Sequence, residues 1–326
     1  MTNSQSFATR LFGLTILIST LSGFISATPA TTDKKIIYYH STINNTDTPV
    51  SLLPLINGTS DQVVTNIIIG QMHLNTTGLS LNDDLISSPK FDRLWPEVAQ
   101  LQQKNIKVSA MLLDKYNVLK GNQTVFDEHY AFLHDALKAH NFDGFDIDDE
   151  DPTALPIQGI ERLIDRLRQD FGPDFLISMS PVASALAGGS NLSGFNYTTL
   201  EQQRGKDIAW YNAQFYGGWG DASTPDGYDA IVNNGFSPDR VVMGLLTNPS
   251  NAGSGFVDLN TTKATLQTLT SKYPQFAGVA GWEYFNSLPG GTQAPWQWSE
   301  FFAQALGVNT GSQSSKRSTR AVAFKA

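Results

Sequence analysis

The sequence contains no cysteine, so no disulfide bond can stabilise the folded chain. Small exported domains usually depend on disulfide bonds, because they bury too little apolar surface to stay folded without them. A chain of 326 residues is long enough to bury a self-sufficient hydrophobic core. The absence of cysteine therefore favours one large domain.

Long hydrophobic runs are also lacking. Near the N-terminus, Arg10 in a polar stretch is followed by an apolar run from Leu11 through Leu17, and then by small residues ending at Ala27. A membrane-spanning helix needs about 20 apolar residues, so this run is too short. The pattern is typical of a secretory signal peptide over residues 1–27, cleaved near Ala27 or Ala30. We expect a secreted, extracellular protein that does not bind membranes.

Basic residues are scarce in the body of the chain. The whole sequence has a net charge of −8, yet Arg10 and the C-terminal segment 311–326 contribute five basic and no acidic residues. Subtracting these five positive charges from −8 leaves −13 for residues 28–310. So acidic a body is a poor partner for nucleic acid or anionic membranes, whereas a neutral glycan or polymer suits it.

The C-terminal segment 311–326 is rich in Ser and Thr and has no apolar face. It predicts a disordered tail after a folded domain at 28–310, with Lys316-Arg317 as a site of proteolytic processing. The sequence contains seven N-x-S/T sequons, which together with the signal peptide indicate a glycosylated eukaryotic protein. We expect most of them to lie on its surface. They begin at Asn44, Asn57, Asn75, Asn122, Asn191, Asn196 and Asn260.

Short apolar runs alternate with amphipathic helical patterns such as the one at 159–171. This alternation predicts the α/β class with a parallel sheet, and eight repeats predict a single (β/α)8 TIM barrel. The candidate strands are Lys35–His40, Thr65–His73, Ile106–Leu113, Gly144–Asp148, Phe175–Ser180, Ile208–Phe215, Arg240–Leu246 and Gly278–Tyr284.

The most informative stretch is the acidic run NFDGFDIDDED at 141–151, which includes the fourth candidate strand. Asp146, Asp148 and Glu150 share one face of a strand, because successive side chains alternate between faces. Crowded carboxylates cannot all ionise easily, so at least one should hold a proton at neutral pH and be able to act as a general acid. A glycosidase site or a metal site would use such a cluster.

The spacing of the acids excludes one kind of metal site, the calcium-binding helix-loop-helix. A calcium-binding helix-loop-helix needs Gly at the sixth loop position and Glu at the twelfth, but these are Asp151 and Ile157 when counted from Asp146. A non-standard cation site and a solvated acidic turn remain alternatives. Against the solvated turn, Phe145 and Ile147 alternate with the acids like the back face of a buried strand. The five histidines lack metal-ligand spacing, and no cofactor is expected.

Residues 143–150, DGFDIDDE, resemble the DGxDxDxE signature of glycoside hydrolase family 18, which contains chitinases and some endo-β-N-acetylglucosaminidases. All five fixed positions match. The variable position before the final Glu is usually apolar in the family, and here it is Asp149. We expect Asp149 to face away from the site, and Asp143 and Gly144 to be structural.

The resemblance implies a retaining mechanism in which the 2-acetamido oxygen of the substrate attacks the anomeric carbon. Glu150 would protonate the leaving oxygen and then activate water. Asp148 would orient the acetamido N–H and stabilise the oxazolinium cation, while Asp146 would share a proton with Asp148.

Two further stretches fit the same family. Gln214-Phe215-Tyr216 resembles the Gln-Phe-Tyr that ends a barrel strand in several of its branches. Tyr216 would then donate a hydrogen bond to the acetamido oxygen, and Gln214 would contact the same sugar; a core tyrosine with a satisfied hydroxyl is the alternative. Trp282 would be the floor under the sugar ring, and Glu283 would bind a sugar hydroxyl or pair with a cation.

One element of the family is missing. Its third strand carries Ser-x-Gly-Gly, but neither a register starting at Ser109 nor one starting at Met111 supplies the glycines. Bulkier residues at 108–114 therefore predict a narrowed or reshaped site.

From about Lys35 to Leu306 the chain is similar to fungal secreted endo-β-N-acetylglucosaminidases of this family. Such enzymes cut between the two core GlcNAc residues of high-mannose N-glycans. The resemblance implies a monomer whose partners are the N-linked glycans of glycoproteins or GlcNAc oligomers. A chitinase with the same catalytic residues is the first alternative. An inactive carbohydrate-binding relative is the second, and the presence of Glu150 argues against it.

Overall fold

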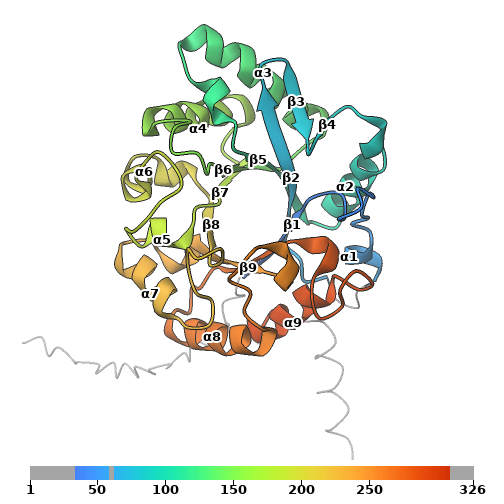
Figure 1. Cartoon of the computed structure of the whole chain (residues 1–326), viewed down its shortest axis with the longest axis vertical. Helices are drawn as coiled ribbons and strands as arrows, with labels where there is room; N and C mark the ends of the chain where they lie inside the picture. The colour runs from blue at the N-terminus through green and yellow to red at the C-terminus, as the bar shows by residue number, and fades with distance from the viewer. Residues whose placement is uncertain (1–33, 59–61, 309–326) are drawn as a thin grey trace, which may run out of the picture. The chain divides into compact units, whose positions relative to one another are not determined.

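Eight parallel strands close into a barrel in the computed structural model, which describes residues 34–58 and 62–308 (Figure 1). Around the barrel the strands follow one another in the order β1, β2, β5, β6, β7, β8, β9 and β10, and β10 pairs with β1. Their bounds are β1 Lys35–His40, β2 Asn66–Asn75, β5 Lys107–Leu113, β6 Gly144–Asp148, β7 Leu176–Met179, β8 Trp210–Gln214, β9 Val241–Leu246 and β10 Gly278–Trp282. The predicted TIM barrel is confirmed, with strand ends shifted by one or two residues.

The helices surround the barrel as an outer ring (Figure 1). They are α1 Pro54–Asn57, α2 Leu94–Gln103, α3 Gln123–Ala139, α4 Ile157–Phe171, α5 Ala183–Leu186, α6 Tyr197–Arg204, α7 Asp226–Asn233, α8 Leu259–Lys272 and α9 Gln297–Ala305. Short 3-10 helices occupy Pro89–Phe91, Tyr116–Leu119, Gly205–Asp207, Pro238–Arg240, Pro249–Asn251 and Tyr284–Asn286. A hairpin of β3 (Gly78–Leu81) and β4 (Asp84–Leu85) extends the sheet beside β2, and the sequence did not predict it.

Helix α4 shows how the sequence builds the outer layer. Ile160, Leu163, Ile164 and Leu167 recur at spacings of three and four residues, and all four are fully buried. An apolar stripe at this spacing lies along one face of a helix and covers the sheet. The predicted amphipathic helix is therefore confirmed.

The barrel strands are largely buried on both faces, as expected for a parallel sheet that is covered on both sides. Outward residues such as Ile36 and Ile67 belong to the large core under the helices. The lumen has a separate cluster. It contains Ile37, Tyr39, Ile68, Met111, Trp210, Val242, Ala277 and Ala280.

Asp143 and Gly144 have the structural role that the sequence predicts. A Cβ atom on Gly144 would lie 2.4 Å from the Leu176 carbonyl oxygen and 2.6 Å from Ser109 Oγ, so only glycine fits between β5 and β7. The Asp143 carboxylate accepts hydrogen bonds from the Val108 N–H and Lys107 Nζ, each at 2.9 Å. These contacts fix the start of β6.

Most sequon asparagines are exposed, as expected; Asn44 and Asn191 are partly buried. The predicted signal peptide at 1–27 and the tail at 311–326 lie outside the described residues. Within the described residues, no helix combines the length and the apolar character needed to cross a membrane.

His40 ends β1 and is a buried base that makes stability depend on pH. It is 1% exposed, and neither ring nitrogen has a hydrogen-bond partner among the described residues. Burial lowers the pKa of His40 from 6.5 to about 3. The unfolded chain binds the proton more readily, so the stability from this residue is complete above pH 6.5 and is lost as the pH falls towards about 3.

Wild-type protein is therefore expected to lose about 1.4 kcal/mol of unfolding free energy per pH unit across that window because of His40. In His40→Phe this component of the slope should disappear, since an aromatic ring can keep the edge contact with Tyr284 without titrating. Denaturant unfolding at several pH values measures both slopes. Parallel slopes for the two proteins would contradict the assignment to His40.

Candidate active site

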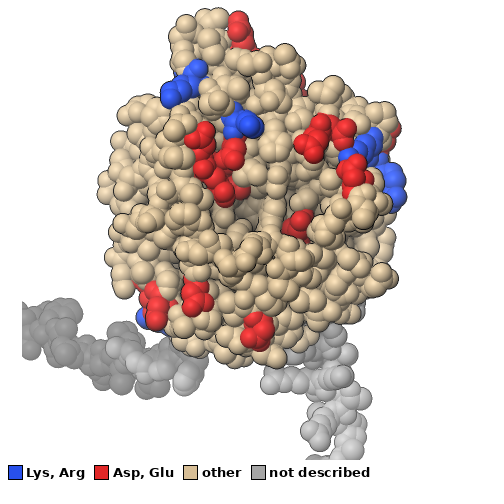
Figure 2. Space-filling view, viewed as in Figure 1, with Lys and Arg blue, Asp and Glu red and all other residues tan. Residues whose placement is uncertain are grey.

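The three predicted acids lie together at the C-terminal end of β6, where the active sites of barrel enzymes are found. The alternation is as predicted: Asp146 and Asp148 face the lumen side, while Phe145 and Ile147 are fully buried in the core under the helices. Figure 2 shows acidic side chains gathered beside the hollow at the centre of this face. The solvated acidic turn is thereby excluded.

Asp146 is completely buried and held by four donors. Tyr39 Oη donates to Oδ2 at 3.0 Å and Asn212 Nδ2 donates to Oδ1 at 3.2 Å, and the hydroxyls of Ser178 and Ser180 also donate to the carboxylate. Burial raises the pKa of Asp146, and these hydrogen bonds oppose the rise. The proton sharing between Asp146 and Asp148 stays a prediction.

Asp148 is 7% exposed, and its surroundings favour the neutral acid. Burial, followed by the charges of Glu150 and Asp146, holds the pKa of Asp148 well above its usual range. Its backbone N–H donates to Tyr116 Oη at 3.0 Å, which fixes the strand end. The direction of this shift fits the expectation that carboxyls so crowded do not all ionise easily.

Gln214, at the end of β8, bridges the acids. Its Nε2 donates to Glu150 Oε1 at 2.9 Å, lies 3.4 Å from Asp148 Oδ1, and donates to the Ser180 carbonyl oxygen at 2.8 Å. The sequence predicted Gln214 beside the acetamido sugar. The structure places its amide between the two carboxyls, a contact that sequence reasoning missed.

Glu150 is only partly buried and lies two residues after the end of β6. Burial raises the pKa of Glu150, the hydrogen bond from Gln214 lowers it, and the charge of Asp114 raises it further. The side chain therefore combines solvent access with a proton that is retained to higher pH. Those are the two properties that a general acid needs.

Tyr216 lies near the acids and keeps its hydroxyl available. Burial, then the charges of Asp148, Glu150 and Asp146, holds the pKa of Tyr216 well above its usual range, so the hydroxyl stays a donor. The side chain is partly exposed, and its hydroxyl has no hydrogen bond to another described residue. A core tyrosine with a satisfied hydroxyl is therefore not what the structure contains.

Trp282 ends β10 and lies at the top of the lumen. Its Nε1 donates to the Asn251 carbonyl oxygen at 3.3 Å, and its ring centre is 5.7 Å from that of Tyr39. The next residue, Glu283, accepts a hydrogen bond from the Ser41 N–H at 3.3 Å, and burial raises its pKa. The indole is thus held in place beside the acids.

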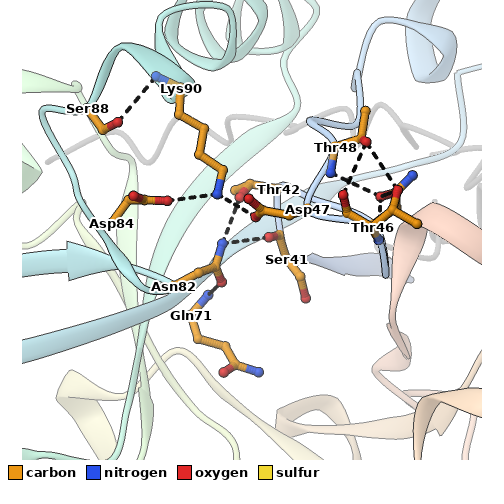
Figure 3. Close-up of polar contacts among 11 residues, drawn as sticks. Ser41, Thr42, Thr46, Asp47, Thr48, Gln71, Asn82, Asp84, Ser88 and Lys90 are labelled. Atoms are coloured by element: carbon orange, nitrogen blue, oxygen red, sulfur yellow. Dashed lines mark hydrogen bonds and ion pairs between the residues drawn. The ribbon is translucent and has the colours of Figure 1, made fainter.

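The loop after β1 is fastened to the β3–β4 hairpin by a polar network (Figure 3). Asn82 Nδ2 donates to the Ser41 carbonyl oxygen and to Thr42 Oγ1, both at 2.9 Å. Lys90 Nζ pairs with Asp84 at 2.7 Å and with Asp47. Since Ser41 also contacts Glu283, the network stabilises the side of the site next to Trp282.

The third barrel strand, β5, departs from the family pattern as predicted. Met111 pairs with Asp146 in the parallel register, and Leu113 pairs with Asp148. Gly70 on β2 makes room for Met111, because a Cβ atom on Gly70 would lie 2.6 Å from Met111 Cε. Strand β5 lacks the family's glycines, and Gly70 on the neighbouring strand β2 provides the space that the Met111 side chain occupies.

Asp149 points into the protein interior. It is 3% exposed, its Oδ1 accepts from the Asp151 N–H at 3.3 Å, and its Oδ2 has no partner among the described residues. Burial raises its pKa to about 7, with the Asp151 N–H opposing the shift and the charge of Asp114 adding to it. Within the described residues, no group of three or more His, Cys, Asp or Glu side chains is arranged to hold a metal ion.

An eight-stranded barrel with clustered carboxyls and a tryptophan at its mouth fits a glycosidase, and comparisons with known proteins show that class. A solved fungal endo-β-N-acetylglucosaminidase of glycosyl hydrolase family 18 is 42% identical with a TM-score of 0.78, over 83% of this chain and 98% of that one. The chitinase ChiC from Aspergillus fumigatus is 45% identical with a TM-score of 0.75, over 84% of this chain and 99% of that one. The chain therefore belongs to glycosyl hydrolase family 18.

The other comparisons are less extensive. Chitinase 2 from Rhizopus oligosporus is 28% identical in an alignment of 152 residues that covers 43% of this chain. The match spans a quarter of the length of that curated relative. No family model matches the sequence.

Proposed function

We propose that the chain is a secreted endo-β-N-acetylglucosaminidase that hydrolyses the GlcNAc-β-1,4-GlcNAc core of high-mannose N-glycans. The observation that carries this proposal is the arrangement of Asp148 and Glu150 under one bridging amide, with the free hydroxyl of Tyr216 beside them. The 42% identity to an endo-β-N-acetylglucosaminidase over nearly its whole length supports the choice of substrate.

In the first step, Glu150 gives its proton to the leaving glycosidic oxygen as the bond from that oxygen to the anomeric carbon breaks. The acetamido oxygen of the substrate forms a bond to the same carbon, which gives an oxazolinium ion. In the second step, the Glu150 carboxylate takes a proton from water, and the water oxygen opens the oxazolinium ring with retention. Bridging by Gln214 holds the acid in place through both steps.

Asp148 orients the acetamido N–H and stabilises the positive charge that develops on the oxazolinium ion. Asp146 acts from below, where its four donors fix the end of β6. Tyr216 donates its hydroxyl to the acetamido oxygen, and Trp282 stacks under the sugar ring. Hydrogen bonds within the barrel hold Asp146 and Glu150, so little reorganisation of these two carboxyls is needed during the reaction.

Secretion is also proposed, with removal of residues 1–27 and processing within 311–326 to leave the catalytic barrel. Exposed sequons in the barrel support a glycoprotein that passes through a secretory pathway. The net charge of −13 over residues 28–310 supports a neutral glycan as partner and not a nucleic acid or an anionic membrane. A monomer is part of the same proposal.

A chitinase is the second candidate, and the 45% identity to ChiC favours it. Both enzymes would use the same acid, so only the products separate them. The secreted protein would be incubated with a high-mannose glycoprotein and, separately, with chitin oligosaccharides, and products read by mass spectrometry. We expect a glycoprotein with one GlcNAc per site. Cleavage of the chitin oligosaccharides alone would replace this proposal with a chitinase, and no cleavage of either would leave a binding protein.

A further inference from the structure

Asp114 is a fourth carboxyl at the mouth of the barrel that the mechanism above does not use. It follows β5 directly, at the level where β5 pairs with the end of β6. Its backbone N–H donates to the Asp148 carbonyl oxygen at 3.0 Å. Its side-chain Oδ1 accepts from the Glu150 N–H, also at 3.0 Å.

The backbone of Asp114 is unusual as well. Asp114 has a φ of 51° and Lys115 a φ of 60°, so two successive residues without glycine lie in the left-handed region. Aspartate tolerates this region better than most residues, but it is still less favourable than glycine there. In the register that starts at Met111, position 114 is that of the second glycine of Ser-x-Gly-Gly. A side chain has replaced the glycine, and it contacts the backbone of the predicted acid.

We propose that Asp114 is a positioning residue, which fixes the backbone of Glu150 from the neighbouring strand and places a negative charge beside its carboxyl. The inference rests on the proposed role of Glu150 as the acid. Asp114 makes hydrogen bonds to residues 148 and 150, on both sides of Asp149, so it determines how the chain leaves β6. Strand β6 ends at Asp148, and Glu150 would otherwise lie on an unpaired segment.

In addition to the rise that burial causes, the negative charge of Asp114 raises the pKa of the Glu150 carboxyl. Four other titratable groups interact electrostatically with Glu150. They are Asp148 and Asp149 on its own segment, Tyr216 after β8, and Tyr197 on α6. A general acid works only when it is protonated, and removal of the Asp114 charge should lower the pKa of Glu150. As the pH rises, activity should therefore be lost at a lower pH than in wild type.

Two substitutions separate the charge of Asp114 from its hydrogen bond. Asp114→Asn keeps an oxygen that can accept from the Glu150 N–H, and asparagine also tolerates the left-handed region. Asp114→Gly removes both the charge and the acceptor, and glycine adopts the backbone conformation without strain. Thermal unfolding should show both variants folded. Asp151→Asn is the matched control, because Asp151 is a partly exposed acid on the same segment whose side chain bonds to Thr153 and not to Glu150.

For Asp114→Asn we expect the alkaline limb of the kcat profile to move about one pH unit lower, with kcat at acid pH within about twofold of wild type. For Asp114→Gly we expect the same shift and a further loss in kcat of about tenfold at every pH, because the acid is less well placed. KM should be unchanged in both variants, and Asp151→Asn should match wild type. A rise in KM alone, or profiles that coincide with wild type, would overturn the proposal.

The outcome can be separated from failure of the proposed function. Wild-type protein is tested first on the high-mannose glycoprotein and on chitin oligosaccharides, and either substrate reports on Glu150. If neither is cleaved, titration of the carbon-13-labelled Glu150 carboxyl by NMR still measures the effect of Asp114. A lower pKa of Glu150 in Asp114→Asn would support the inference even then, and an unchanged pKa would refute it.

Discussion

Replacing Glu150 with Gln is expected to slow hydrolysis by about a thousandfold, which is within the range that general acid–base catalysis contributes. Glutamine has the same shape and keeps an oxygen that can accept from Gln214 Nε2, so the site should stay assembled. It cannot protonate the leaving oxygen, and it cannot activate water in the second step. Release of glycan from a high-mannose glycoprotein measures the loss.

Glycan binding by the same variant should survive, because the substitution removes a proton donor and leaves the sugar-facing surfaces intact. Calorimetric titration with uncleaved glycan tests this. Glu128→Gln, on the exposed face of α3, is the control and should behave as wild type. Hydrolysis by Glu150→Gln at near wild-type rates would show that another group is the acid.

Replacing Asp148 with Asn is expected to slow cleavage of the glycan by about a hundredfold or more, while turnover of a pre-formed sugar oxazoline is largely kept. The carboxylate is needed to orient the acetamido group and to stabilise the charge as the ring forms. An oxazoline substrate has already completed that step. Comparing the two rates in one variant isolates the role of Asp148.

The same variant should fold at least as well as wild type. Burial holds the pKa of Asp148 well above its usual range, so an ionised carboxylate is costly at this buried position and a neutral amide of the same shape avoids that cost. Thermal unfolding at neutral pH measures this. An equal loss on both substrates would contradict the assigned role, and Glu150→Gln combined with Asp148→Asn should lose oxazoline turnover as well.

The sequence predicted the barrel well because each of the eight strands is a compact apolar run with a helical pattern after it. The acids were found for the same reason: Asp146, Asp148 and Glu150 lie within one strand and its immediate end, where the period of two decides which side chains share a face. Tyr216 and Trp282 were predicted as site residues through the family resemblance. Their sequence positions alone do not distinguish them from core residues.

What the sequence did not predict depends on contacts between strands. Gln214 lies 64 residues from Glu150 along the chain, and Asp114 lies 36 residues from it, so no local pattern links them. The β3–β4 hairpin is short: β3 has four residues and β4 has two, so the alternation of Leu79 and Leu81 with polar or small residues is too brief to predict a strand. The one available signal was the missing Ser-x-Gly-Gly, which indicated that β5 would differ without indicating that Asp114 would contact Glu150.

The pairing of Gly70 with Met111 affects how this enzyme can be altered. Each residue occupies space that the other leaves free, across two adjacent strands. If only position 111 is varied, the library tests only side chains that fit beside Gly70. If only position 70 is varied, any new side chain clashes with the Met111 methyl group. The two positions should therefore be randomised together, as a single unit of sequence that determines the volume of the lumen just below the acids.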